Sequence, residues 1–144
     1  MNHIPPIGSV MTPFPYVVQQ DDSVLAARAL MVEHDLRHLP VQDGHRLVGV
    51  LTDRDLKRAM DPALGLPPKD ELFVRDVFVA DAYIVDSAEP LDRVLERMTA
   101  EHIGSALITK AGKLVGIFTP MDACRILYQH LRSLFPSKSG NDVA

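Results

Sequence analysis

Two threonine–aspartate pairs have a spacing that could hold a ligand. Thr52 and Asp55 follow the apolar run in GVLTDRDL, and Thr119 and Asp122 follow the one in GIFTPMD. A helix that begins at the threonine offers unpaired backbone N–H groups, beside the hydroxyl, to a phosphate. One turn later, the carboxylate can accept hydrogen bonds from both hydroxyls of a ribose. The spacing therefore suits phosphate and ribose.

The same residues also have a purely structural interpretation. Thr at a helix N-cap with an acidic residue three positions later is a capping-box arrangement, although Glu or Gln is more usual at that place than Asp. An acidic residue in the first turn also interacts favourably with the helix dipole. Capping and ligand binding do not exclude each other, so the spacing alone leaves both open.

The two pairs belong to an internal repeat. LVGVLTDRD (47–55) recurs as LVGIFTPMD (114–122), an offset of 67 residues. Over 51 ungapped positions nine are identical, and five of the nine fall within this window. Two copies of one supersecondary unit are expected. The expected boundaries are 1–60 for the first repeat, 61–73 for a Pro-rich linker, 74–135 for the second repeat and 136–144 for a disordered tail.

Each copy has the pattern strand, helix, strand, strand, helix. Short β-branched segments (16–18 and 83–85) come first, and Asp22-Ser23 is typical of a helix start. Asp43-Gly44 between two apolar runs indicates a hairpin. One sheet and two helices leave an apolar face on each unit. We therefore expect an α/β (α+β) fold in which two repeats, related by an approximate twofold axis, pack sheet to sheet.

Composition limits the possible partners. The chain has 144 residues, 47% of them hydrophobic and 24% charged, which is ordinary for a globular protein. A net charge of -4 provides no general attraction to a phosphate backbone, and no apolar run approaches the roughly 20 residues of a membrane span. The single cysteine, Cys124, cannot form an internal disulfide. We expect a cytoplasmic protein that binds neither nucleic acid nor membrane.

The order of elements and three motifs resemble the cystathionine-β-synthase (CBS) domain. The motifs are VMTP (10–13), HDLRHLPV (34–41) and GVLTDRD (49–55), and the resemblance covers about residues 7–130. The second copy departs from it, with Phe78 at the Met of VMTP. The resemblance implies a tandem pair, called a Bateman module, which binds AMP, ADP, ATP, NAD or S-adenosylmethionine between its repeats. It also implies frequent pairing into flat homodimers and regulation of an attached enzyme or transporter.

The resemblance further implies that each Thr and Asp contacts phosphate and ribose, and that His or Arg before the second strand reaches the phosphate. Here those cations are Arg37 and His38, while Arg54 follows the first threonine closely. The second copy has Ser105 at the place of His38 and Met121 at that of Arg54. The alternative is a solvated charge for each arginine and an edge-strand polar residue for the histidine.

The adenine would lie against the first strand of a repeat, where the apolar residues would form core in any case. Gly49 and Gly116 would allow a base or another backbone to approach closely. The expected nucleotide-binding residues are Thr52, Asp55, Arg54, Arg37, His38, Val17, Thr119, Asp122, Ile84 and Ser105.

No catalytic or metal-binding pattern is evident. The six histidines are scattered, one cysteine cannot build a zinc site, and no P-loop is present. Cys124 is expected to be a small buried residue rather than a nucleophile. We therefore expect a non-enzymatic module with no obligatory cofactor, catalytic residue or metal.

The preferred function is a stand-alone sensor that binds an adenine nucleotide between its repeats and signals to a partner protein. The alternative is a dimeric interaction scaffold with degenerate ligand sites. A homodimer is expected because Leu56, Met60, Leu127 and Leu131 would otherwise be exposed. The first site, with its extra cations, should bind phosphorylated adenosine more tightly than the second. The sequence does not specify which nucleotide binds, how many sites fill, the regulated partner or the dimer orientation.

Overall fold

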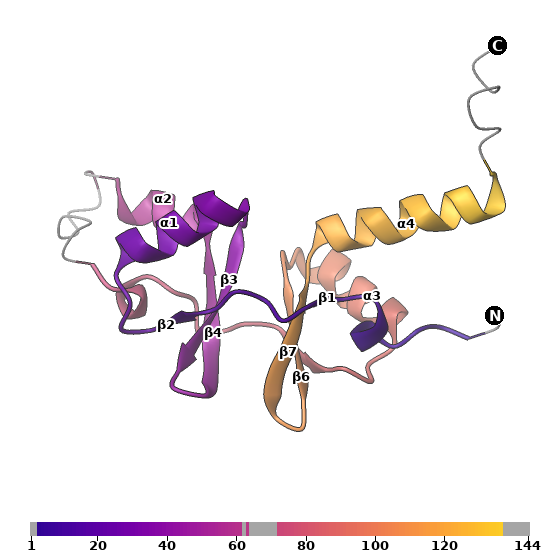
Figure 1. The fold of residues 1–144 in the computed structure, drawn as a ribbon, viewed down its shortest axis with the longest axis horizontal. Helices are drawn as coiled ribbons and strands as arrows, with labels where there is room; N and C mark the ends of the chain where they lie inside the picture. The colour runs from indigo at the N-terminus through magenta and orange to yellow at the C-terminus, as the bar shows by residue number, and fades with distance from the viewer. Residues whose placement is uncertain (1–2, 62, 64–71, 137–144) are drawn as a thin grey trace, which may run out of the picture.

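The computed structural model describes residues 3–61, 63 and 72–136, and it contains two similar units (Figure 1). The first comprises β2 (Val18–Gln19), α1 (Val24–His34), β3 (His38–Asp43), β4 (Arg46–Thr52) and α2 (Asp53–Ala59). The second comprises β5 (Ile84–Asp86), α3 (Leu91–Glu101), β6 (Ala106–Lys110), β7 (Lys113–Phe118) and α4 (Pro120–Leu134). The predicted order of elements is confirmed in both units. Linker residues 62 and 64–71 and tail residues 137–144 lie outside the described residues.

Local sequence signals explain the element boundaries. Ser23 is the N-cap of α1, where its side chain accepts a hydrogen bond of 3.0 Å from Ala26 N. Pro90 is the N-cap of α3, directly before its first residue Leu91. Both hairpins turn through residues with positive φ, at Gly44 (65°) and Gly112 (78°), which is the backbone that such tight turns require.

The strands form two mixed sheets, one in each unit. The first has the order β2-β3-β4, with β2 parallel and β4 antiparallel to β3. The second has the order β1-β7-β6-β5, in which β1 (Thr12–Pro13) belongs to the N-terminal segment of the chain. The fold is therefore a mixed α/β fold, as predicted.

The segment before each unit packs on the other unit. Ile7, in the 3-10 helix η1 (Ile7–Ser9), is fully buried in the core of the second unit, and its N–H donates to Glu89 O (2.7 Å). Val74, in η4 (Val74–Asp76), is fully buried in the core of the first unit, and its N–H donates to Asp22 O (2.8 Å). This exchange ties the two units together.

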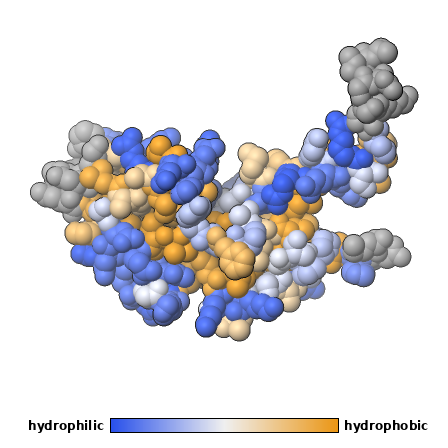
Figure 2. All heavy atoms as spheres, in the orientation of Figure 1, coloured by the Kyte–Doolittle hydropathy of each residue, from blue (hydrophilic) through white to orange (hydrophobic). Residues whose placement is uncertain are grey.

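The two sheets also share an apolar cluster between them, as expected. Val50 from β4, Leu107 from β6 and Ile117 from β7 are buried there. Figure 2 shows apolar atoms in the middle of the molecule, where the two halves meet. Sheet-to-sheet packing therefore covers the apolar face that each unit would otherwise expose.

Helix α4 differs from α2 in length and exposure. It extends beyond its own unit in Figure 1, and Leu127 (57%) and Leu131 (46%) are exposed, as predicted. Two related expectations are wrong. Leu56 is only 2% exposed because α2 packs it into the first core, and Cys124 is exposed because it faces away from the core. Among the helices of the described residues, none combines the length and apolar character that a bilayer crossing requires.

Candidate functional site

The first Thr-x-x-Asp forms a capping box at the start of α2. Asp55 N donates to Thr52 Oγ1 (3.1 Å), and Thr52 N donates to Asp55 Oδ2 (2.9 Å). The structural interpretation of this motif is therefore confirmed. Both side chains are half-buried, and within the described residues the Asp55 carboxylate accepts no other hydrogen bond. Most of its acceptor capacity is consequently free.

In the second Thr-x-x-Asp, Asp122 caps the Thr119 N–H, but the Thr119 side chain makes no cap hydrogen bond. The Asp122 carboxylate makes more hydrogen bonds than that of Asp55. Asp122 Oδ2 accepts from Thr119 N (2.8 Å) and from Thr119 Oγ1 (3.3 Å). Asp122 Oδ1 accepts from Thr12 Oγ1 (2.7 Å) and from Arg125 Nη1 (2.9 Å). The residue is only 5% exposed. We call Asp122 with these three partners the Asp122 cluster.

Arg125 extends this cluster to the backbone of the N-terminal segment, because its Nη2 donates to Val10 O (3.2 Å). Neither Thr12 nor Arg125 is among the binding residues predicted from the sequence. The only signal for Thr12 is its place in VMTP, where the second copy has Val79. Arg125 corresponds to Arg58 of the first repeat at the same offset of 67 residues, so its role could not be inferred from identity alone.

His38 belongs to the first repeat and also approaches the second repeat. It begins β3 opposite Thr52 in the strand register, and a Cβ atom added to Gly104 of the second repeat would lie 3.0 Å from its Nε2 atom. Burial lowers the pKa of His38 below its ordinary value of 6.5, while the charges of Asp53 and Asp55 oppose that shift. His38 is therefore neutral near pH 7 in the unliganded protein.

The two predicted arginines remain exposed. Arg37 and Arg54 form no ion pair within the described residues, although their positive charges are among the causes that lower the pKa of His38. The structure therefore brings Arg37, Arg54 and His38 into one electrostatic neighbourhood around the first capping box. Ser105, the counterpart of His38, is 6% exposed and adds no charge to the second.

The predicted adenine-contact residues lie on edge strands or just before them. Val17 is half-buried immediately before β2, and Ile84 is 45% exposed at the start of β5. The segment that leads to Ile84 pairs with the strand of the first capping box, at Val79–Val50. The segment that leads to Val17 pairs with the strand of the second, at Thr12–Ile117. In each case, the strand that ends at a Thr-x-x-Asp motif pairs with the segment that leads into the first strand of the other repeat.

Gly49 and Gly116, which occupy corresponding positions in the two repeats, lie where the exchanged segments cross. A Cβ atom on Gly49 would overlap Val79 O and lie 2.7 Å from the Phe78 ring, and one on Gly116 would overlap the Met11 side chain. To relieve contacts this short, the Val79 backbone would have to shift at Gly49, and the flexible Met11 side chain would have to shift at Gly116. The close approach expected at these glycines is therefore made by the exchanged segments.

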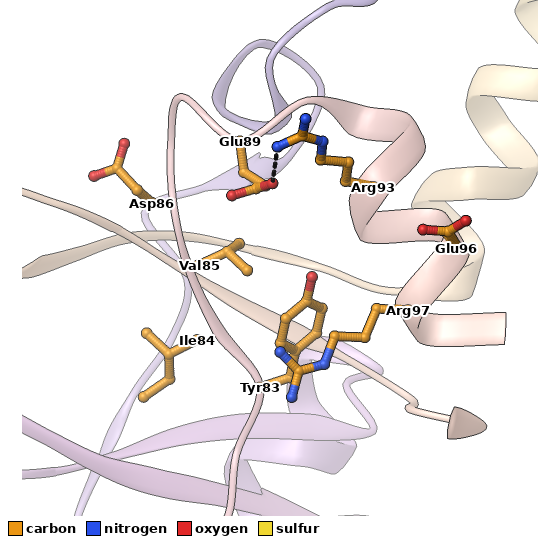
Figure 3. A pocket seen from close by; sticks show the side chains of 8 residues that line it. All are labelled: Tyr83, Ile84, Val85, Asp86, Glu89, Arg93, Glu96 and Arg97. Carbon is orange, nitrogen blue, oxygen red and sulfur yellow. Dashed lines mark ion pairs between the residues drawn. The ribbon is translucent and has the colours of Figure 1, made fainter. Parts of the chain in front are cut away.

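A surface hollow of about 490 Å³ lies between β5 and α3 (Figure 3). It includes Ile84, but it contains neither capping box. Its cations are already engaged, because Arg97 lies over the Tyr83 ring (4.6 Å) and pairs with Glu101 (3.0 Å), while Arg93 approaches Glu89 (3.9 Å). The hollow therefore offers no free positive charge for a phosphate. Among the described residues, no three His, Cys, Asp or Glu side chains are placed to hold a metal ion.

Comparison with known proteins identifies both repeats. The CBS domain family model matches residues 7–62 and 74–129. Hypoxic response protein 1 from Mycobacterium tuberculosis is 32% identical over 117 residues, 78% of each chain. The structure of a proposed acetoin utilization protein (AcuB) from Vibrio cholerae has a TM-score of 0.81, with 26% identity over 94% of this chain and 98% of that one. The structure of CBSX2 in complex with AMP has a TM-score of 0.73, with 27% identity over 89% and 99%.

Other relatives are much longer than this chain. The chain spans 23%, 21% and 12% of three curated proteins, a sulfurtransferase, a dehydrogenase and a nucleotidyltransferase. These matches report on a shared segment rather than on the activity of those proteins.

Proposed function

The chain belongs to the CBS domain family, as a tandem pair, and from this premise we propose that it is a regulatory module that binds an adenine nucleotide and signals to a partner protein. The observation that carries the proposal is the Asp55 carboxylate. It is half-buried at the start of a helix, and one hydrogen bond leaves most of its acceptor sites unused. A half-buried carboxylate with free acceptors suits the paired hydroxyls of a ribose.

Phosphate would be held beside this ribose position. Thr52 Oγ1 accepts from Asp55 N, so the hydroxyl hydrogen can still donate to a phosphate oxygen. Arg37 and Arg54 carry charges that no described acidic group neutralises at ion-pair distance. Because α2 has only seven residues, the proposal rests on these side chains rather than on the helix dipole.

The base would lie toward Ile84. The chain reaches Ile84 from Val79, which pairs with Val50 two residues before Thr52. A ligand whose ribose contacts Asp55 would therefore extend toward the first strand of the second repeat, and it would bridge the two repeats. Val17 takes the corresponding place beside Thr119. The likeness to CBSX2, which was solved with AMP, supports an adenine ligand.

Signalling would pass through a homodimer. The apolar side chains on the outer half of α4 are exposed, and a shallow hollow of about 270 Å³ lies among Tyr128, Leu131, Arg132 and Phe135. A second copy would cover this surface about a twofold axis. A nucleotide that bridges the repeats would shift the dimer toward the geometry that binds it more tightly. Sedimentation at micromolar concentration should give about twice the chain mass of 15.9 kDa, and a monomer would contradict the dimer.

Calorimetry with AMP, ADP, ATP, NAD and S-adenosylmethionine tests the central proposal. At least one should bind to the wild-type protein, and Asp55→Asn should weaken that binding at least tenfold, because an amide is a poorer acceptor for two hydroxyls than a carboxylate. If none binds, or if Asp55→Asn binds normally, the Asp55 site is not the sensor.

The second candidate is a dimeric interaction scaffold whose ligand sites are degenerate. It is favoured by the completed capping box of α2 and by the exposed surface of α4. Such a scaffold would keep the same melting temperature with every nucleotide, whereas a bound ligand raises it. Product formation on incubation with ATP, AMP or NAD would contradict both candidates, since both are non-enzymatic.

A further inference from the structure

The Asp122 cluster uses the whole acceptor capacity of its carboxylate. An ionised carboxylate offers about four acceptor sites. Four hydrogen bonds from Thr12, Arg125 and Thr119 reach its two oxygens, two at each. A ribose would have to displace at least one of these donors, and it would have to reach a carboxylate that is only 5% exposed. Asp122 is consequently a poor ribose acceptor as it stands.

The first repeat has equivalent positions but lacks this arrangement. Val79 stands where the second site has Thr12, and the backbone pairing is the same, since Val79 pairs with Val50 and Thr12 with Ile117. Valine has no hydroxyl to donate. Arg58, the counterpart of Arg125, is exposed and makes no hydrogen bond to Asp55 within the described residues. The difference between the two carboxylates therefore lies in what Thr12 and Arg125 do.

The second terminal nitrogen of the Arg125 guanidinium is also hydrogen-bonded. Its Nη2 donates to Val10 O while its Nη1 donates to Asp122. The two bonds fix the side chain between α4 and the N-terminal segment. Arg125 is therefore a structural link here, and it does not offer the second site the free cation that Arg37 or Arg54 offers the first.

We infer that Thr12 and Arg125 determine which carboxylate can take a nucleotide: they commit Asp122 to the fold and restrict binding to Asp55, at one nucleotide per chain. This inference rests on the proposed function. It assigns the selectivity between two otherwise similar sites to two residues outside the Thr-x-x-Asp motifs.

Calorimetric stoichiometry with AMP tests the inference. The wild-type chain should bind one AMP. Thr12→Val combined with Arg125→Ala removes both hydrogen bonds to Asp122 Oδ1 and should raise the stoichiometry to two. Adding Asp122→Ala to this double variant should return the stoichiometry to one. Arg58→Ala, at the matched position of the first repeat, should leave one. Two AMP per wild-type chain, with one lost in Asp122→Ala, would overturn the inference, as would a double variant that folds and still binds one.

A reciprocal variant covers the case in which the double variant fails to fold. Val79 is 42% exposed, so Val79→Thr should fold, and it would place a hydroxyl donor toward Asp55. One competing hydrogen bond should weaken AMP binding about fivefold. Unchanged affinity would count against the inference. If the wild type binds no nucleotide, the proposed function fails, and the inference is then judged by whether the double variant gains a site that Asp122→Ala removes.

Discussion

The two Thr-x-x-Asp motifs of this protein share their spacing, their place after a hairpin and their strand register, yet their carboxylates have different roles. Asp55 is half-buried and bonded once, whereas Asp122 is 5% exposed and bonded four times. The cause lies in two residues outside the motif: Thr12 of the exchanged segment, where the other repeat has Val79, and Arg125, whose counterpart Arg58 makes no hydrogen bond to Asp55 within the described residues. An identical motif in two copies therefore does not imply an identical role, because residues outside the motif decide how much of the carboxylate is free.

The largest expected effect is on stability, at Asp122. Asp122→Ala should lower the free energy of unfolding by about 3 kcal/mol, because it removes a 5% exposed carboxylate together with its four hydrogen bonds. Asp55→Ala should lower it by about 1 kcal/mol, the usual value of a helix cap. Urea unfolding of both variants measures the difference, and equal losses would show that the Asp122 cluster adds nothing beyond capping.

Glycine substitutions sharpen the comparison of the exchanged segments. Gly49→Ala should destabilise the protein by about 2 kcal/mol, because the new methyl group meets the Val79 backbone and the Phe78 ring. Gly116→Ala should cost about 1 kcal/mol, because the flexible Met11 side chain can move away. Thermal unfolding of both variants measures the difference. A larger loss of stability in Gly116→Ala than in Gly49→Ala would contradict this explanation.

The cations around the first capping box should set its affinity for phosphate. Arg37→Gly and Arg54→Met install the residues of the second repeat at these positions, and each should weaken AMP binding about tenfold if it removes a charge-assisted contact. Arg46→Ala, at the far end of β4, is the matched control and should bind as the wild type does. The expectation is wrong if Arg37→Gly and Arg54→Met both bind AMP as tightly as Arg46→Ala does.

The smallest effect concerns His38, which Ser105 replaces in the second repeat. Its folded pKa is below the ordinary value of 6.5, so the unfolded chain takes up a proton first as the pH falls. The stability from neutral His38 is complete above pH 6.5 and is lost as the pH falls through the folded pKa. Between pH 7.5 and pH 5, the free energy of unfolding should therefore fall less steeply in His38→Gln than in the wild type. A parallel pH dependence in wild type and variant would rule out this assignment.

The repeat itself was predictable from the sequence because the signals that define it are local. Ser23 begins α1, Gly44 and Gly112 make the hairpins, and Thr52 and Thr119 begin helices as their spacing indicates. Caps and turns depend on residues within about four positions of each other, so a single copy of the motif suffices to predict them. Burial was harder to predict, and Leu56 and Cys124 were assigned the wrong environment because helical spacing does not specify which face meets the core.

From its sequence alone, the chain determines two CBS repeats, sheet-to-sheet packing and two capped helices that follow their hairpins. Only the tertiary structure decided how the repeats exchange segments and which carboxylate stays free. Thr12 and Asp122 are separated by 110 positions, and their hydrogen bond exists only because the N-terminal segment crosses to the second repeat. Such a contact has no local sequence signal, since its partners meet only after both repeats have folded and packed.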